Sequence, residues 1–215
     1  VYNISEEVSF DSNMQSILTR KYPSKDAQVK VINSISTALD NYMYNYSEID
    51  QIEVYSDNPY ITEYKQYHPV TQEIADEAWY QKAVKQSSVF WVEMVNYDKY
   101  NNEYWNLCLV RKIPLVNSKY HAVLVIRVSD NYLNTRMSSQ EYQMCASVDN
   151  GRIFYATSRD DYGEQQFVTI DYNENYFQYA GSLKLHNKTC FVDMSTLHLY
   201  QSDSKIYICT LNDKS

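Results

Sequence analysis

The run Y-H-A-V-L-V-I-R-V at residues 120–128 shows no alternation of polar and apolar residues at its centre. Side chains of a strand point to opposite faces in turn, so a continuous apolar centre predicts a strand that is covered on both faces. Such a strand needs neighbouring strands beside it and further elements packed above and below. The rest of the chain has to supply a sheet with helices against it.

The first 47 residues show helical periodicity. Ser24, which follows Pro23, can cap a helix whose apolar residues recur at intervals of three and four. These residues are Val31, Ile32, Ile35, Ala38, Leu39, Tyr42 and Met43. A weaker helical pattern runs from Ile4 to Leu18. The sequence therefore predicts a helical region over residues 1–47 that contains one long helix.

After residue 47 the pattern changes to that of strands. I-D-Q-I-E-V-Y-S (49–56) is rich in β-branched residues and ends at the turn signal Asp57-Asn58-Pro59. A helix is predicted at 76–86, and the strands after it are joined by loops short enough for antiparallel neighbours. These strands are 89–95, 103–113 and 120–128. We expect a first lobe over residues 48–138.

A second, smaller lobe is predicted over 139–215, after a short linking helix at 130–137. Strand-like runs flank Asn150-Gly151, a strong signal for a two-residue hairpin turn. Further strands are predicted at 189–194, 197–200 and 205–211. The stretch 158–182 is polar and has no assignment. The expected fold class is α+β, with antiparallel sheets in two lobes after a long N-terminal helix.

Charge and hydropathy exclude two classes of surface. The net charge of −8 and the dispersed basic residues argue against nucleic-acid binding, which needs clustered Lys and Arg. No window approaches the roughly 20 apolar residues of a membrane helix. The chain begins at Val1 without a methionine or a signal-peptide core, so we expect it to be a piece of a longer protein.

The sequence contains no recognisable catalytic or metal-binding pattern. The four histidines are far apart, adjacent acidic pairs do not face each other, and three glycines cannot build a phosphate-binding loop. We therefore expect no enzyme activity in this fragment, no catalytic residue, no metal and no cofactor. The competing interpretation, a hydrolase, would need distant histidines and carboxylates to converge in a cleft.

The four cysteines leave the redox state open. None of them forms a C-x-x-C pair, which argues against a zinc knuckle. Cys108, Cys145 and Cys209 lie in apolar runs, where a reduced cysteine packs as a small hydrophobic residue. Cys190 and Cys209 could instead form a disulfide across neighbouring strands.

Three tryptophans fall within 27 residues: Trp79 in the predicted helix, then Trp91 and Trp105 on strands. Tyr80 follows Trp79 directly. Adjacent residues on a helix point about 100° apart, so one apolar face cannot bury both rings equally. Each ring therefore either completes the core or lines a pocket. The 23 tyrosines either reflect the composition of the source organism or supply rings with a polar end.

Arg111 lies inside the apolar strand 103–113, on the same face as Trp105. A buried guanidinium needs a partner because an unpaired buried charge is costly. One interpretation is an ion pair with Glu93 or Glu77. The other is a ligand contact in a pocket between the helix and the sheet. The candidate ligand-binding residues are therefore Trp79, Tyr80, Trp91, Trp105 and Arg111.

The order of these features resembles the double Cache, or PAS-like, extracellular sensor region of bacterial sensor histidine kinases, above all those of the YesM type. The motifs that carry the resemblance are E-A-W-Y-Q-K-A-V (77–84), V-F-W-V-E-M (89–94), L-C-L-V-R-K-I-P (107–114) and A-V-L-V-I-R-V-S (122–129), followed by D-N-Y-L-N (130–134). The resemblance is strongest over residues 48–157. It implies two PAS-like lobes on the extracellular face of the bacterial membrane, held between two membrane helices.

In this family the membrane-distal lobe binds a small molecule between its sheet and the helix with the W-Y pair. Trp79 and Tyr80 match that pocket-facing pair. Members that bind amino acids carry Arg two positions before the Trp and Asp two positions after the Tyr. This sequence has Glu77 and Lys82 there. The reversed charges disfavour the carboxylate of an amino acid, and aromatic walls with polar groups suit a sugar.

The resemblance also implies partners for the whole protein. It is expected to be a membrane-anchored, homodimeric histidine kinase that signals through the N-terminal helix and the membrane helices to a cytoplasmic response regulator. The alternative is a glycan-binding surface lipoprotein or adhesin domain, which would expose its tryptophans on an open face.

Overall fold

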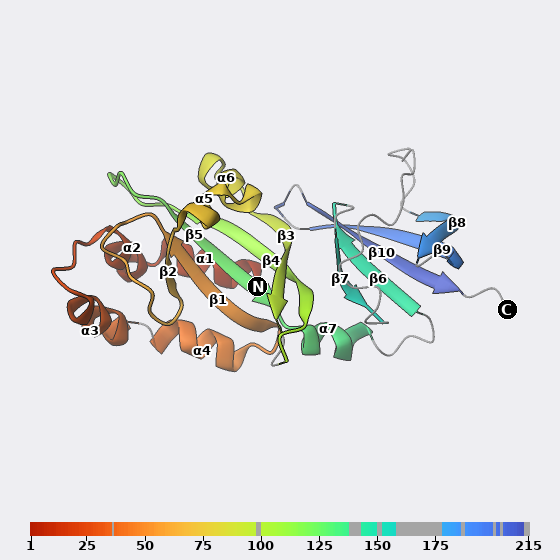
Figure 1. Ribbon diagram of the computed structural model, residues 1–215, viewed down its shortest axis with the longest axis horizontal. Coiled ribbons are helices and arrows are strands. Elements are labelled where there is room, and N and C mark those ends of the chain that lie inside the picture. Colours follow the sequence, from red (N-terminus) through yellow and green to blue (C-terminus); the bar gives the residue numbers. More distant parts are fainter. Residues whose placement is uncertain are drawn as a thin grey trace. The chain divides into compact units, whose positions relative to one another are not determined.

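The structure is a computed structural model that describes residues 1–35, 37–97, 100–137, 143–149, 152–157, 178–185, 188–199, 201–202 and 204–212. The chain divides into two compact units. The first is Val1–Phe90 with Cys108–Ser129, and the second is Trp91–Leu107 with Asp130–Ser215. Two strands, β3 (Phe90–Tyr97) and β4 (Glu103–Ile113), contribute residues to both units. Both strands are labelled in Figure 1.

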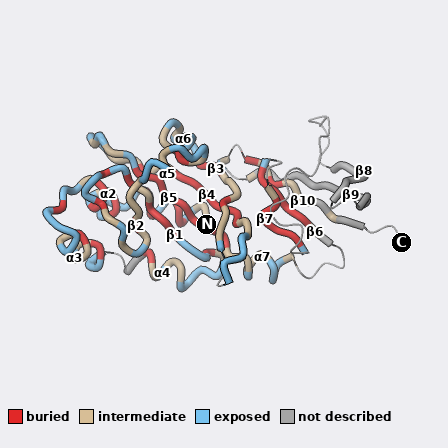
Figure 2. Tube along the Cα trace, in the orientation of Figure 1, coloured by how far each residue is buried: buried red, intermediate tan, exposed pale blue. Residues whose placement is uncertain are grey.

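The first sheet has the strand order β2-β1-β5-β4-β3. The other strands are β1 (Ile49–Ser56), β2 (Tyr67–Pro69) and β5 (Ala122–Val128). β1 and β4 each pair antiparallel with β5, and β2 pairs parallel with β1. All of β5 is buried, as its apolar run predicts. Figure 2 shows the buried positions gathered along β5 and its neighbours.

Helices lie on both faces of this sheet. On one face are α1 (Tyr2–Phe10), α2 (Ser12–Thr19), α3 (Lys25–Ile35) and α4 (Thr37–Asn45). The core of the first unit packs between these helices and alternate residues of the strands, such as Ile52, Leu124 and Ile126. The other face carries α6 (Ala78–Lys85), with the short helix α5 (Gln72–Asp76) beside it.

Capping residues explain where the N-terminal helices begin. Asp11 has an extended backbone between α1 and α2, and its carboxylate accepts the Met14 N–H at 2.7 Å. Ser24 Oγ accepts the Ala27 N–H at 3.2 Å, as predicted for the helix after Pro23. The predicted long helix is present as α3 and α4, and Ser36 between them lies outside the described residues.

Two buried side-chain amides fasten these helices to the loop after β1. Asn58 Nδ2 donates to the carbonyl oxygens of Leu18 at 2.8 Å and Arg20 at 3.0 Å. Gln28 Nε2 donates to the Thr62 carbonyl at 3.0 Å, and its oxygen accepts the Thr62 N–H at 2.9 Å. The two amides supply hydrogen-bond partners to backbone groups at the end of α2 and in the loop. They therefore hold the loop against α2 and α3.

The helix predicted at 76–86 begins later than expected. Glu77 has extended backbone angles, with φ −66° and ψ 133°, and separates α5 from α6. Thr71 caps α5 by accepting the Ile74 N–H at 3.3 Å. The sequence did not reveal α5 and β2, because runs of five and three residues carry too little periodicity to be recognised.

The second unit contains α7 and a sheet with the strand order β7-β6-β10-β9-β8. Its elements are α7 (Asp130–Met137), β6 (Gln143–Val148), β7 (Ile153–Ala156), β8 (Gln178–Leu185), β9 (Lys188–His198) and β10 (Lys205–Asn212). The predicted hairpin is present as the antiparallel pair β6 and β7; its turn lies outside the described residues, as do 158–177. A single strand, β9, replaces the two predicted at 189–194 and 197–200.

The strand register argues against a disulfide between Cys190 and Cys209. Cys209 pairs with Met194 on β9, four residues from Cys190, and with Cys145 on β6. Four residues of strand span about 13 Å, well beyond the Cα separation that a disulfide bridges.

Candidate functional site

The face of the first sheet that α6 covers carries polar and aromatic side chains. Glu53 and Tyr55 alternate along β1 with the core residues of the opposite face, and their register partners on β5 are Val125 and Val123. Arg127 lies two positions further along β5, on the same face. Contacts between Tyr55 and α6 identify this face as the one that the helix covers.

A connected group of aromatic rings lies here: Tyr55, His68, Trp79 and Tyr80. The centroid of the Tyr55 ring is 5.3 Å from that of Trp79 and 5.2 Å from that of His68. Trp79 and Tyr80 meet edge to face, with centroids 5.7 Å apart and an interplanar angle of 89°. This geometry is favourable because a ring's positive edge meets a negative face. Tyr80 is 6% exposed, whereas Trp79 stays partly exposed; Trp79 is therefore the ring of the pair that a ligand can reach.

A buried ion pair lies beside Tyr55. Arg127 Nε donates to Glu53 Oε2 at 2.8 Å, and the two side chains are 11% and 9% exposed. Burial, together with the charge of Glu53, raises the pKa of Tyr55, so its hydroxyl stays protonated. The area therefore offers a hydroxyl, a guanidinium and a carboxylate as hydrogen-bonding groups.

These residues form what we call the α6-facing cluster: Glu53, Tyr55, His68, Trp79, Tyr80 and Arg127. His68 joins the cluster through its ring, and its Nδ1 lies 2.6 Å from Glu63 Oε1. His68 Nε2 is buried and has no hydrogen-bond partner among the described residues. It is a polar atom of the cluster that a ligand could satisfy.

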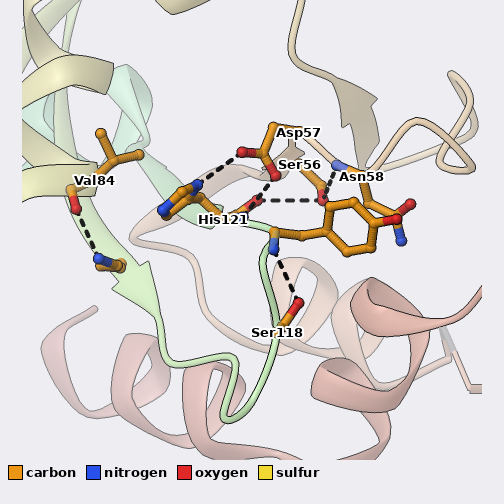
Figure 3. A network of polar contacts seen from close by, with 8 residues as sticks. Ser56, Asp57, Asn58, Val84, Ser118 and His121 are labelled. Carbon is orange, nitrogen blue, oxygen red and sulfur yellow. Dashed lines mark hydrogen bonds and ion pairs between the residues drawn. The ribbon is translucent and has the colours of Figure 1, made fainter.

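The charge of Asp57, the residue after β1, influences the pKa of Tyr80. Burial raises the pKa of Tyr80 to about 12, and the carboxylate of Asp57 adds to the increase. Asp57 binds His121 twice: Oδ1 accepts the backbone N–H at 2.6 Å, and Oδ2 lies 2.8 Å from Nδ1 (Figure 3). The next residue, Asn58, holds the end of α2 through the Leu18 carbonyl. Asp57 and Asn58 thus bring polar groups that bind His121 and the end of α2 close enough to influence Tyr80 on α6.

Arg111 lies on the face of the sheet that α1 covers. Its Nε donates to Ser5 Oγ at 3.0 Å, and its guanidinium carbon is 4.9 Å from the centroid of the Tyr2 ring. Within the described part of the first unit no carboxylate pairs with it, so the ion pair with Glu77 is absent. The next residue, Lys112, points to the other face and donates to a backbone carbonyl of α6 at 2.7 Å.

Trp91 and Trp105 belong to the second unit. The backbone N–H of Trp91 donates to Ser204 Oγ at 3.1 Å, and that hydroxyl donates back to the Trp91 carbonyl at 3.2 Å. The guanidinium of Arg152 is 4.4 Å from the centroid of the Trp105 ring. Of the predicted site residues, Trp79 and Tyr80 are thus the members of the α6-facing cluster.

The sequence did not point to the other members of this cluster. Glu53 and Tyr55 could have been found, because they occupy the alternate face of a strand whose core face is Ile52 and Val54. Arg127 was hidden in an apolar run, and His68 lies on the unrecognised strand β2.

Among the described residues no group of His, Cys, Asp and Glu side chains is arranged to hold a metal ion. No helix in the described part of the chain is long and apolar enough to span a bilayer.

The sequence matches no protein-family model and no curated protein, but the fold matches solved structures. The extracellular domain of rpHK1S-Z16, a candidate histidine kinase, has a TM-score of 0.61 at 10% identity, covering 98% of this chain and 92% of that one. The periplasmic sensory domain of the Campylobacter jejuni chemoreceptor Tlp1 has a TM-score of 0.62 at 12% identity, covering 99% and 87%. The ligand-binding domain of the Pseudomonas aeruginosa amino-acid chemoreceptor PctC, in complex with GABA, has a TM-score of 0.56 at 10% identity, covering 99% and 89%.

The chain has the double Cache, or PAS-like, sensor fold. The expected α+β class is confirmed. The similar solved structures include extracellular domains of candidate histidine kinases and the periplasmic sensory domain of a chemoreceptor. At this identity the similarity extends to the Cache fold alone. What the site of this chain can bind therefore has to be argued from its own side chains.

Proposed function

We propose that this chain is the extracellular ligand-sensing domain of a membrane-bound sensor histidine kinase of the YesM type, and that it binds a small molecule at the α6-facing cluster. The sensory roles of the structurally similar Cache domains support this proposal. The observation that carries it is the partly exposed Trp79 ring against Tyr55, beside a buried ion pair of Arg127 and Glu53. Rings with convergent polar groups are typical of small-molecule sites.

The proposed ligand is a sugar. The similar chemoreceptor domains PctC, PctB and CtaA were solved with GABA, L-Arg and L-isoleucine. In this chain, however, Glu77 and Lys82 stand where amino-acid-binding members carry Arg and Asp, and Lys82 Nζ lies 4.3 Å from the centroid of the Phe90 ring. The rings of the α6-facing cluster can pack on the apolar faces of a sugar, while its hydroxyl and charged groups bind sugar hydroxyls.

Signalling is proposed to pass through the N-terminal helices to membrane helices and a cytoplasmic response regulator, in a homodimer. A ligand that moves Trp79 also moves the Tyr80 ring packed against it and so changes the surroundings of Asp57, and the adjacent Asn58 holds the end of α2. A ligand shifts such an equilibrium only by its different affinity for the two states, typically about 1–3 kcal/mol.

A thermal-shift screen with sugars, amino acids and simple carboxylates tests the ligand site. We expect a sugar to raise the melting temperature of the unmodified protein but not of Trp79→Ala. Tyr44→Ala, a change at an 89% exposed ring on α4, is the matched control and should keep the response. The site is wrong if no compound raises the melting temperature, or if Trp79→Ala responds like the unmodified protein.

The whole protein separates the proposal from a glycan-binding lipoprotein or adhesin. We expect hydrophobic segments on both sides of this region, and autophosphorylation in membrane vesicles that changes when the active sugar is added. A whole protein without kinase activity would favour the adhesin.

A further inference from the structure

A cavity of 110 Å³ lies between the N-terminal helices and β2. Its lining residues are Glu7, Val8, Asp11, Asn13, Met14, Leu39, Tyr42 and Tyr67. Tyr67 pairs with Val54, whose side chain belongs to the core on the α1–α4 face. Neighbouring residues on a strand point to opposite faces, so the cavity is on the other face of the sheet from Tyr55. It is separate from the α6-facing cluster.

The inner wall of the cavity is apolar. Val8, Met14, Leu39 and Tyr67 are all buried and belong to the core of the first unit. Protein interiors are normally packed without gaps, because each void forfeits dispersion contacts. A cavity next to such a core is therefore a site at which a small apolar group would gain contacts.

The hydroxyl of Tyr67 is a polar group at this wall that is poorly satisfied. Tyr67 is fully buried. Among the described residues its hydroxyl makes one hydrogen bond, to Met14 Sδ at 3.6 Å. A thioether is a weak acceptor, and both lone pairs of the phenol oxygen remain without a donor. Buried polar groups are normally better satisfied than this, so the oxygen is available to a donor on a ligand.

The remaining polar groups of the cavity include two carboxylates, which only accept hydrogen bonds, and the amide of Asn13, which can also donate. Glu7 and Asp11 bring two carboxylates, and none of the lining residues is basic. Asp11 Oδ1 accepts the Met14 N–H as the cap of α2, and the second oxygen of that carboxylate is left for another donor. Burial, together with the neighbouring carboxylate of Glu7, raises the pKa of Tyr42 to about 12. A matching ligand must carry positive charge and several N–H donors.

We propose that this cavity binds a small organic ammonium ion, with its charged end at Glu7 and Asp11 and a short apolar chain against Val8 and Leu39. A cavity of about 150 Å³ holds benzene, so 110 Å³ suits a ligand with roughly four or five heavy atoms. The ligand would contact α1, α2 and α4 together. It would thus act on the same helices as the proposed sugar site, but from a different place.

Butylammonium is a suitable probe, with 1-butanol as an isosteric control and butyrate as a control of opposite charge. In a protein with ¹³C-labelled methionine methyl groups, we expect butylammonium to shift the Met14 signal in a saturable way at roughly millimolar concentration. The Met94 signal, in the second unit, should not move. Butanol lacks the charge and butyrate reverses it, so neither should produce a saturable shift.

Two conservative substitutions test the carboxylates. Asn caps a helix as well as Asp does, so Asp11→Asn preserves α2 while removing the charge. The combined variant with Glu7→Gln should bind butylammonium at least tenfold more weakly, whereas Trp79→Ala should bind it normally. Equal shifts with butanol, unchanged affinity in the combined variant, or no saturable shift would each overturn the proposal. None of these outcomes bears on the sugar site, because the two sites share no residue.

Discussion

Arg127 Nε lies 2.8 Å from Glu53 Oε2 on the sheet face that α6 covers, and both side chains are about nine-tenths buried. Removing two charges from water is costly, and their attraction offsets this cost only while both partners are present. The pair therefore adds little net stability. Its effect is to hold a guanidinium and a carboxylate in fixed positions next to Tyr55, where a ligand's hydroxyl groups could meet them.

Breaking this pair should be costly, and removing both charges should be less so. We expect Arg127→Met to lower the free energy of unfolding by about 3–5 kcal/mol, because it leaves the Glu53 carboxylate buried and unpaired. Combining it with Glu53→Met should recover a clear part of this loss. Urea denaturation followed by circular dichroism measures both. A double variant as unstable as the single one would contradict the interpretation.

The ring of Tyr55 should matter more for stability than its hydroxyl. Tyr55→Phe keeps the contacts with Trp79 and His68 and should cost about 1 kcal/mol of unfolding free energy. Tyr55→Ala removes both ring contacts and leaves a space under α6, so it should cost roughly 2–4 kcal/mol. Denaturation curves of the two variants give the comparison. Equal losses would mean that the hydroxyl, and not the ring, holds this region together.

Hydrophobic periodicity was sufficient to locate the strands that build the core. β1 and β4 have the predicted bounds, and β5 is buried along its whole length. These segments are long enough to show their period, and each buries side chains against a layer of helices. Local pattern and tertiary packing therefore agree at these strands.

The composition of the site could not be predicted in the same way. Arg111 and Lys112 are adjacent cations on β4, and the sequence does not say which of them faces α6. That depends on which face of the sheet each helix covers. Glu53 and Arg127 are 74 residues apart and meet through the register of β1 with β5. Neither strand alone contains this information, because register is a property of the pair.

Asn58 should be important for stability although it lies in a loop. It is 1% exposed, and its side chain donates to the carbonyls of Leu18, in the last turn of α2, and of Arg20, which caps that helix. Asn58→Ala leaves these buried acceptors without a donor and should cost about 1–3 kcal/mol of unfolding free energy. Asn134→Ala, at an exposed position on α7, is the control and should change stability little. Hydrogen exchange of the α2 amides should increase in Asn58→Ala. If exchange is unchanged, the loop does not hold this helix.

Glu93 on β3 should make the stability of the chain depend on pH. Its Oε1 accepts the Val148 N–H at 2.7 Å. Burial outweighs this bond and raises the pKa of the carboxyl from 4.5 to about 7. Folding therefore favours the protonated acid. Its contribution to stability is fully present below pH 4.5 and is lost as the pH rises through 7, and the loss is at most about 3 kcal/mol.

Glu93→Gln isolates this effect, because glutamine keeps an oxygen for the Val148 N–H and carries no charge. The variant should gain stability relative to the unmodified protein between about pH 4.5 and pH 7, and the difference should level off above about pH 8. Glu103→Gln, at an exposed position on β4, should follow the unmodified protein throughout. Urea midpoints over this pH range provide the measurement. Parallel curves for Glu93→Gln and the unmodified protein would mean that the pKa of this carboxyl does not change on folding, with its bond to Val148 balancing its burial.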